Sequence, residues 1–308
     1  MVNKSVKLYR GLQGVYFDRT RTTFIDGSNG ILEYRGYNIH DLAEKSTFEE
    51  VSYLLLHGDL PNRQQLDTFN DSLKEARNLP EQIFSIIDEI KNSHPMDVLR
   101  TAVSALASFD EDRENDTVEG AIKKGIRLTS QVPTIVMAHH NIRNGNPPIE
   151  PNQNLNHAGN FLYMLNGKIP SQQTINLMDK DFILHADHGS NASAFTARVV
   201  ASTNADLHGA ITAGIAALSG PSHGGAAENV MQMAKEIESP EKAEGYVKTL
   251  LANRERVMGF GHRVYRSEDP RARHLKEGVK RLSAEVGQPQ WYQILEAVQK
   301  AMSPYSRR

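Results

Sequence analysis

Residues 192–218 read ASAFTARVVASTNADLHGAITAGIAAL, a stretch that is rich in alanine, threonine, serine and isoleucine and poor in charge. Its second half has apolar residues at helical spacing, namely Leu207, Ile211, Ile215 and Leu218. Gly220-Pro221 then ends the helix. A helix pair of this composition is buried on most sides, either in a core or at a subunit interface. The stretch therefore favours an all-α fold and gives a reason to expect a homodimer.

The sequence on either side continues the helical pattern. Further helices are predicted, from their apolar stripes and their start and end signals, between a capping box at Ser46 or Thr47 and Gly58, from Ser93 and Pro95 to Leu106, and from Asp269-Pro270 to about Val286. The only strands expected are short ones near residues 23–25 and 31–34, joined by a turn at 26–30. Strands and helices do not alternate, which argues against a Rossmann or barrel fold.

The composition changes beyond His223, where the predicted helices become shorter and more charged. We interpret this change as the boundary between a large helical domain, residues 1–223, and a smaller helical domain, residues 224–308. A length of 308 residues is typical of two domains.

Composition excludes several classes of protein. Hydrophobic residues make up 39% and charged residues 23% of the chain, and no apolar run approaches a bilayer span. The formal net charge of −2 gives no electrostatic reason to expect a nucleic-acid partner. The chain has no cysteine, and the N-terminus lacks the apolar segment of a secretory signal. These features predict a soluble, cytoplasmic protein that binds neither nucleic acid nor membrane.

Three histidine segments stand out because each is set among small residues. They are 186–191 (ADHGSN) around His188, 220–226 (GPSHGGA) around His223, and 259–265 (GFGHRVY) around His262. A lone histidine is most often a hydrogen-bonded structural residue, but flanking glycines let the backbone approach a ligand closely. Three such segments in one chain favour a shared pocket.

The residues of these segments suit an anionic carbonyl substrate. His223 lies in a turn that opens a helix, where the helix dipole disfavours the imidazolium form. A neutral imidazole can donate a hydrogen bond to a carbonyl, which suits enolisation of a thioester. Arg271 follows His262 by nine residues and could grip a carboxylate through two hydrogen bonds, although a surface helix arginine would fit the same pattern.

Other interpretations have weaker support. His185 and His188 could ligate a metal, but no third ligand follows at a diagnostic spacing, and no metal is expected. The glycines at 259 and 261 lack the third glycine of a dinucleotide fingerprint. The pair His139-His140 has no partner pattern and is assigned as structural or surface.

Together, these segments resemble the citrate synthase family over essentially the whole chain, with wording typical of its dimeric bacterial and archaeal branch. The matching blocks are, in order, 11–15 (GLQGV), 32–37 (LEYRGY), 48–51 (FEEV), 94–97 (HPMD), the three histidine segments, and 269–272 (DPRA). The resemblance implies an acyltransferase of the tricarboxylic acid cycle. Such an enzyme condenses acetyl-CoA with oxaloacetate and water, through an enol and citryl-CoA, to citrate and CoA, and it needs no cofactor.

The resemblance also implies residue roles. His188 and His262 would bind oxaloacetate, with His262 polarising the keto oxygen, and Arg271 would hold a carboxylate. His223 would stabilise the enol of acetyl-CoA. The CoA adenine site would be lined by Val257, Met258, Gly259, Phe260 and Gly261.

Two departures from the family pattern affect this expectation. Complete family members continue beyond the position of Arg308 with a Pro-Asn-Val-Asp-type motif that carries the catalytic aspartate, two further substrate arginines and a tail that wraps the partner subunit. Ser222 and Ala227 replace a usual leucine and asparagine beside His223. The expected function is therefore citrate synthase with an impaired 308-residue chain. The alternatives are a 2-methylcitrate synthase that uses propionyl-CoA, or a non-catalytic paralogue or fragment that binds substrate or pairs with a full-length subunit.

Overall fold

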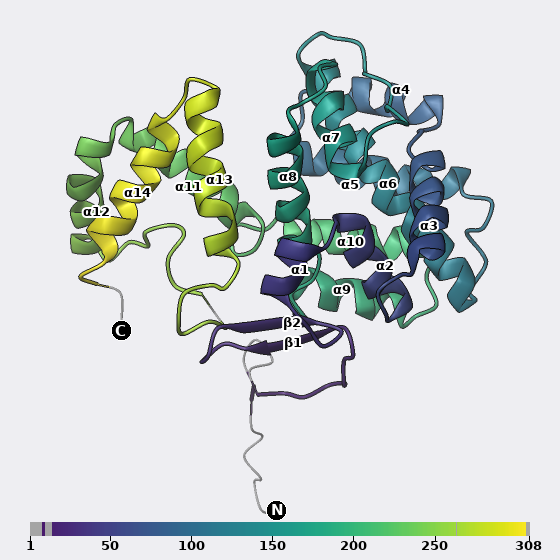
Figure 1. Ribbon diagram of the computed structural model, residues 1–308, viewed down its shortest axis with the longest axis horizontal. Coiled ribbons are helices and arrows are strands. Elements are labelled where there is room, and N and C mark those ends of the chain that lie inside the picture. Colours follow the sequence, from purple (N-terminus) through teal and green to yellow (C-terminus); the bar gives the residue numbers. More distant parts are fainter. Residues whose placement is uncertain (1–7, 10–13, 263, 306–308) are drawn as a thin grey trace, which may run out of the picture.

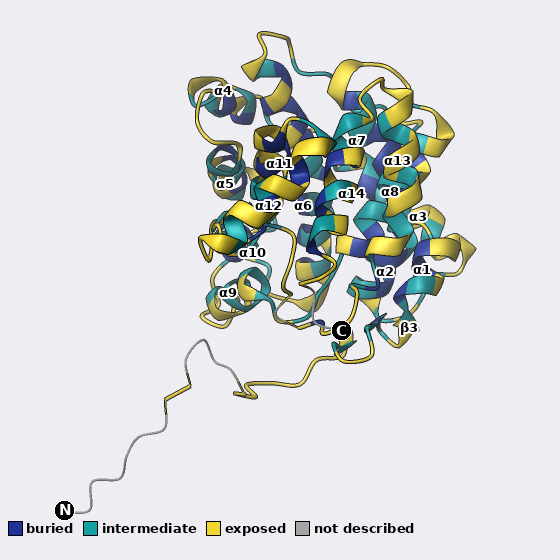
Figure 2. Ribbon diagram, turned by 90° about the vertical axis from the view of Figure 1, so that its left-hand side faces the viewer, coloured by how far each residue is buried: buried dark blue, intermediate teal, exposed yellow. Residues whose placement is uncertain are grey.

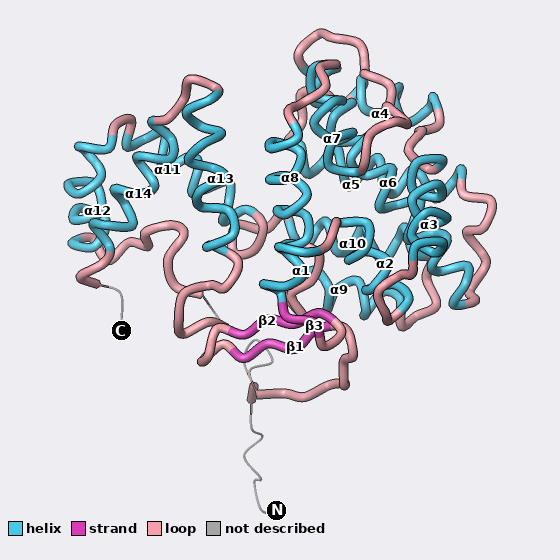
Figure 3. Tube along the Cα trace, viewed as in Figure 1, coloured by secondary structure: helices cyan, strands magenta, loops and turns pink. Residues whose placement is uncertain are grey.

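The structure, a computed structural model, describes residues 8–9, 14–262 and 264–305. Most of the chain is helical, and a small antiparallel sheet lies below the helices in the view of Figures 1 and 3. Its strands, in the spatial order β1-β2-β3, are β1 (Thr23–Asp26), β2 (Ile31–Tyr34) and β3 (Tyr37–Asn38). The mainly helical fold and the two predicted strands are confirmed, whereas the two-residue β3 was not predicted. The block at 11–13 and position 263 lie outside the described residues.

The first ten helices form the larger body of the molecule (Figure 1). They are α1 (Ile39–Lys45), α2 (Phe48–His57), α3 (Arg63–Glu75), α4 (Glu81–Glu89), α5 (Pro95–Leu106), α6 (Val118–Arg143), α7 (His157–Asn166), α8 (Gln172–His185), α9 (Ala192–Ala201) and α10 (Leu207–Leu218), with a short 3-10 helix η2 (Ala107–Phe109). Two apolar clusters hold this body together. One joins α4, α5, α6 and α10, and the other joins β2, α1, α2 and α8.

The remaining helices lie on the left in Figure 1. They are α11 (Gly225–Ile237), α12 (Ala243–Ala252), α13 (Ala272–Glu285) and α14 (Gln290–Met302), with a 3-10 helix η3 (Pro240–Lys242). Helices α11, α12 and α14 enclose an apolar cluster of their own, with Met233, Val247 and Val298 among its buried side chains. Helix α13 also packs against α8, where Gly278 leaves room for Leu177.

Helix starts test the capping predictions directly. Thr47 caps α2 and forms the full capping box with Glu50, as predicted. Helix α5, however, begins with His94 as its N-cap, because the imidazole Nδ1 rather than Ser93 accepts the Met96 N–H at 3.2 Å. Helix α13 begins at Ala272, two residues later than predicted. Its N-cap is Arg271 rather than Asp269, whose carboxylate accepts the Arg271 backbone N–H at 3.1 Å and binds the Arg271 guanidinium, before the first residue of the helix.

The helix pair at residues 192–218 is only partly buried within this chain. In α10 the buried residues are His208, Ala210 and Ile215. Every residue of α9 is intermediate or exposed, and Figure 2 shows this helix without the dark blue of buried positions. The prediction that α9 is buried in the core of its own chain is therefore wrong.

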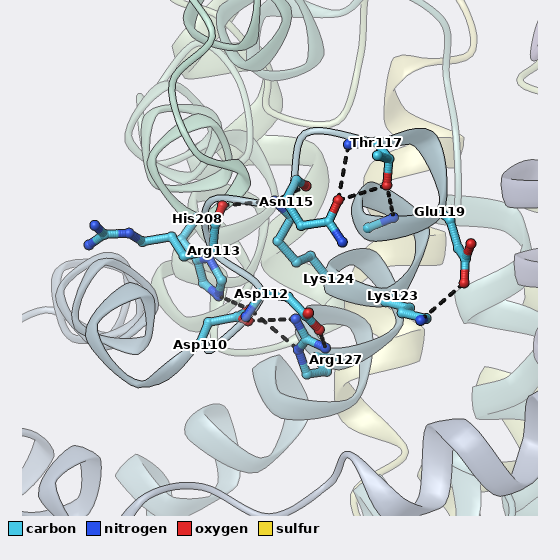
Figure 4. A network of polar contacts seen from close by, with 11 residues as sticks. Asp110, Asp112, Arg113, Asn115, Thr117, Glu119, Lys123, Lys124, Arg127 and His208 are labelled. Carbon is cyan, nitrogen blue, oxygen red and sulfur yellow. Dashed lines mark hydrogen bonds and ion pairs between the residues drawn. The ribbon is translucent and has the colours of Figure 1, made fainter.

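A dense polar network fixes the loop between η2 and α6 (Figure 4). The Arg127 guanidinium pairs with both Asp110 and Asp112, at 2.9 Å from the latter. The buried Lys124 ammonium donates to the carbonyls of Arg113 and Asn115, both at 2.9 Å. The network borders a cavity of about 260 Å³. Because Asp110 and Asp112 already neutralise Arg127, this arginine offers the cavity no unpaired positive charge. The contacts of the network explain how the loop is held.

No helix in the described part of the chain is both long enough and apolar enough to cross a bilayer.

Candidate active site

The His188 loop connects α8 to α9 and rests on the β-hairpin. Its backbone turns at Gly189, where φ is +62°, a conformation that favours glycine. The Asp187 carboxylate accepts the Gly189 N–H at 3.1 Å and a hydrogen bond from the Thr23 hydroxyl. These contacts present the half-buried His188 ring, whose Nε2 lies 3.1 Å from the Tyr265 hydroxyl.

The His262 loop connects α12 to α13, and its own backbone fixes the imidazole. Gly259 and Gly261 have φ values of +85° and +82°, which explains the two glycines in this segment. The His262 Nδ1 accepts the N–H groups of Val264, at 3.1 Å, and Tyr265, at 3.0 Å. Because Nδ1 is an acceptor, the neutral ring carries its proton on Nε2. His262 therefore offers one N–H donor to a ligand.

Three rings form one cluster. The His188 and His262 rings meet edge to face, with centroids 5.5 Å apart. The Tyr265 ring lies 5.4 Å from His188 and 4.9 Å from His262. The structure thus brings together two of the predicted histidines, and it adds a buried tyrosine to which the sequence pattern assigned no role.

Arg271 lies at the start of α13, close enough for its charge to act on both imidazoles. Its side chain is 18% exposed, and its guanidinium binds the Asp269 carboxylate through Nε at 2.9 Å and Nη2 at 2.7 Å. Burial alone would raise the pKa of Asp269, but the bonds from Arg271 hold it below its ordinary value. The predicted carboxylate ligand is therefore paired with a carboxylate of its own chain.

The electrostatics keep both imidazoles neutral near pH 7. Burial lowers the pKa of His188 to about 4, and the positive charge of Arg271 acts in the same direction. Burial also lowers the pKa of His262, partly opposed by Asp269 and reinforced by Arg271. Burial and Asp269 raise the pKa of Tyr265 to about 12, so its phenol stays protonated. The cluster is a set of neutral hydrogen-bonding groups beside a guanidinium.

His223 lies immediately before α11, as its segment predicted, with Gly224 at the N-cap. Its Nε2 is 2.9 Å from the Ser193 hydroxyl, and that hydroxyl donates to the Asn191 side chain at 2.8 Å. Asn191 caps α9 and ends the His188 loop. A chain of hydrogen bonds through Ser193 and Asn191 therefore connects His223 to the end of the His188 loop. Ser193 was not predicted as a site residue, because a serine in the first turn of a helix is common without any ligand.

The residues of the predicted CoA segment, 257–261, range from buried to exposed. Val257 is buried in the cluster of α11, α12 and α14, and Met258 packs against that cluster. Phe260 is 37% exposed. The side chain of Val257 therefore serves the core, and the Gly259–Gly261 backbone is the part that lies in the loop next to His262.

Three other histidines considered in the sequence are accounted for by their surroundings. His185 hydrogen-bonds to Asp181 within α8. His139 is buried with Nε2 2.9 Å from the Lys91 carbonyl, and His140 is exposed, as the sequence suggested. Across residues 8–9, 14–262 and 264–305, no three histidine, aspartate or glutamate side chains are grouped as a metal site.

Neutral imidazoles and a guanidinium on neighbouring loops of a helical fold are chemically suited to an anionic ligand with a carbonyl group. Comparisons with known proteins identify the family. The family model described as "Citrate synthase, C-terminal domain" matches residues 11–308. The chain belongs to the citrate synthase family, whose members use no cofactor.

Individual relatives give the extent of the match. A "Citrate synthase" of Deinococcus radiodurans is 44% identical over 292 residues, 94% of this chain and 78% of the relative. A "2-methylcitrate synthase" of Mycobacterium tuberculosis is 38% identical over 96% of this chain and 76% of its own. The citrate synthase of Thermoplasma acidophilum, solved with carboxymethyl coenzyme A and oxaloacetate, superposes with a TM-score of 0.91 at 30% identity, covering 97% of this chain and 80% of that one.

Proposed function

We propose that this protein condenses acetyl-CoA with oxaloacetate to give citrate and free CoA. The observation that carries the proposal is the fixed tautomer of His262, whose Nδ1 accepts two backbone N–H groups so that Nε2–H is left for a keto oxygen. A neutral donor in a partly buried cluster stabilises charge that develops on that oxygen when the carbonyl is attacked. Relatives of this chain named citrate synthase, and the oxaloacetate bound in the Thermoplasma enzyme, support the same reaction.

Each residue has a distinct part in the proposed reaction. His188 and Arg271 bind the oxaloacetate carboxylates, for which Arg271 must share or exchange its bond to Asp269. His223 donates a hydrogen bond from Nδ1 to the thioester oxygen as the methyl group of acetyl-CoA loses a proton, for which the Ser193 hydroxyl must turn its proton from Asn191 to the His223 Nε2. The enol carbon attacks the keto carbon, the keto oxygen takes up the proton, and water hydrolyses the resulting citryl-CoA.

The proton-abstracting base is the weak point of this scheme in residues 1–308. The resemblance assigns that role to an aspartate of a Pro-Asn-Val-Asp-type motif, and no such motif occurs in this sequence. Of the carboxylates nearest the cluster, Asp187 is bonded to Thr23 and Asp269 to Arg271. Because a general base contributes about a hundred- to ten-thousand-fold in rate, we expect little turnover from the 308-residue polypeptide.

The release of CoA thiol tests the proposal, and the absence of cysteine removes any thiol background from the protein. We expect slow or no oxaloacetate-dependent release from residues 1–308, and robust release from a version extended by the C-terminal segment of a relative. Robust release from residues 1–308 alone would refute the requirement for that aspartate. Silence from both versions would favour a non-catalytic paralogue that binds substrate or pairs with a full-length subunit.

A second acyl-CoA remains in competition with acetyl-CoA. The relative named 2-methylcitrate synthase is 38% identical to this chain, close to the values for relatives named citrate synthase. Comparing acetyl-CoA with propionyl-CoA in the extended version decides between them.

We also propose that the protein is a homodimer and that residues 1–223 and 224–308 act as two domains that close over the substrates. The exposed and half-buried face of α9 supports the dimer, and the separate apolar cluster of α11, α12 and α14 supports the division. Sedimentation equilibrium at micromolar concentration tests the dimer, which a monomer would contradict.

A further inference from the structure

Gly27, in the turn between β1 and β2, touches the His262 loop from the opposite end of the chain. Its φ lies outside the left-handed region, so the turn itself does not require glycine. A Cβ atom at this position would lie 2.1 Å from the Val264 carbonyl oxygen and 2.7 Å from the Val264 carbonyl carbon. Glycine is needed at position 27 because the backbone of the other loop passes there.

A hydrogen bond joins the same two segments. The Arg266 N–H donates to the Gly27 carbonyl at 2.7 Å. Beside it, a Cβ on Gly30 would lie 2.9 Å from the Ser267 hydroxyl. In Figures 1 and 3 the loop that precedes α13 runs down to the left-hand end of the hairpin, where this contact occurs. The turn therefore supports residues 264–267, which lie between His262 and Arg271.

The strands of the hairpin support the His188 loop as well. Thr23 and Ile25 are two positions apart in β1, so their side chains lie on the same face of the sheet. The Thr23 hydroxyl donates to the Asp187 carboxylate, and Ile25 lies 3.5 Å from the Cβ position of Gly189. One small sheet thus contacts both loops that carry the ring cluster.

The ring cluster depends on where this support holds the backbone. The His262 Nδ1 accepts the N–H groups of Val264 and Tyr265, and the Tyr265 hydroxyl lies 3.1 Å from the His188 Nε2. All three bonds involve residues next to the carbonyl that a Cβ at position 27 would strike. A backbone shift of about 1 Å lengthens such bonds beyond hydrogen-bonding distance.

We propose that the β1–β2 turn is a positioning element of the oxaloacetate site, in which Gly27 sets the place of the 264–267 loop so that His262 and Tyr265 meet His188. The identity of the ligand rests on the proposed function. The positioning itself does not, because the contacts that carry it join residues of the chain to one another.

The test compares Gly27→Ala with Ser28→Ala in the 308-residue protein. Ser28 is exposed in the same turn, so its variant adds no atom toward the loop. The readouts are the imidazole nitrogen resonances of His188 and His262 without ligand, and the oxaloacetate dissociation constant from calorimetry. For Gly27→Ala we expect both sets of resonances to move and affinity to fall about tenfold or more, since misplacement by about 1 Å has effects of this order. Ser28→Ala should match the wild type.

Unchanged imidazole resonances in Gly27→Ala, or resonances that move equally in Ser28→Ala, would overturn the proposal. If Gly27→Ala does not fold, Tyr265→Phe removes only the hydroxyl at the end of the same chain of contacts. It should shift the His188 resonances and spare the three apolar clusters, and an unmoved His188 would overturn the proposal. A wild type that binds no oxaloacetate would refute the proposed function, while the ligand-free resonances would still decide the positioning.

Discussion

Replacing the buried Asp179 by asparagine should stabilise this protein at neutral and alkaline pH. Asp179 lies in α8 and is 8% exposed, and both carboxylate oxygens accept the Phe48 N–H at the start of α2, at 3.2 and 3.3 Å. Burial, with the nearby Glu49 carboxylate, raises the pKa of Asp179 from 3.8 to about 7, although the Phe48 N–H lowers it. The folded protein thus holds a proton that the unfolded chain has already lost.

The sign and size of the effect follow from this difference. Between pH 3.8 and about 7 the folded state binds more protons at Asp179 than the unfolded state does, so stability declines as the pH rises through this window. One pKa unit corresponds to about 1.4 kcal/mol, and the rise from 3.8 to about 7 therefore amounts to about 4 kcal/mol at most. Asparagine keeps an oxygen for the Phe48 N–H and has no charge to bury.

Urea denaturation at several pH values from about 5 to about 8 measures this difference. We expect Asp179→Asn to exceed the wild type by about 1–4 kcal/mol at the alkaline end, with the gap closing toward the acidic end. Asp71→Asn, an exposed aspartate in α3, is the control and should leave the pH profile of the wild type unchanged. A variant that is less stable than the wild type at about pH 8, or a gap that does not depend on pH, would refute the reasoning.

Three further predictions concern the site and its surroundings. Because the pKa values of His188 and His262 are lowered, oxaloacetate affinity should change by less than about threefold between about pH 6 and about pH 8, and a tenfold gain on acidification, measured by calorimetry, would contradict this. Arg271→Lys should weaken oxaloacetate binding about tenfold or more, because an ammonium cannot make the planar two-point contact; equal affinities in the same assay would count against the assigned role. The His40 Nδ1 and His274 Nε2 share a 2.7 Å hydrogen bond, and burial lowers the pKa of both histidines below 6.5. The pair therefore contributes its full stability to the folded protein above pH 6.5 and loses it as the pH falls through the lowered pKa values. His274→Asn should therefore reduce the loss of unfolding free energy between about pH 7 and about pH 5, and an unreduced loss would show that the pair does not titrate as described.

Local patterns in the sequence determine most of the fold. Helical periodicity, the Thr47 capping box and the glycine after α2 depend on residues within one or two turns of each other, and the structure confirms them. The predicted helix starts were wrong where two neighbouring residues, or two partners of one side chain, competed for the N-cap. At α5 the His94 imidazole took the place of Ser93 as the cap, and at α13 the Asp269 carboxylate paired with Arg271 rather than capping the helix.

The sequence by itself also selected the chemistry, because glycine-flanked histidines are unusual enough to mark the loops around His188, His223 and His262. Only the tertiary structure decided how those loops meet. Tyr265 reaches His188 across 77 positions of the chain, and Gly27 receives the Val264 backbone from the far end of the sequence. Such contacts are set by the packing of whole helices and strands, which bring distant residues within hydrogen-bonding distance without leaving a periodic signal in either segment. For the same reason, the tautomer of His262 and the lowered pKa of His188 could not be obtained from residue types alone, since both depend on which backbone groups and charges surround the ring.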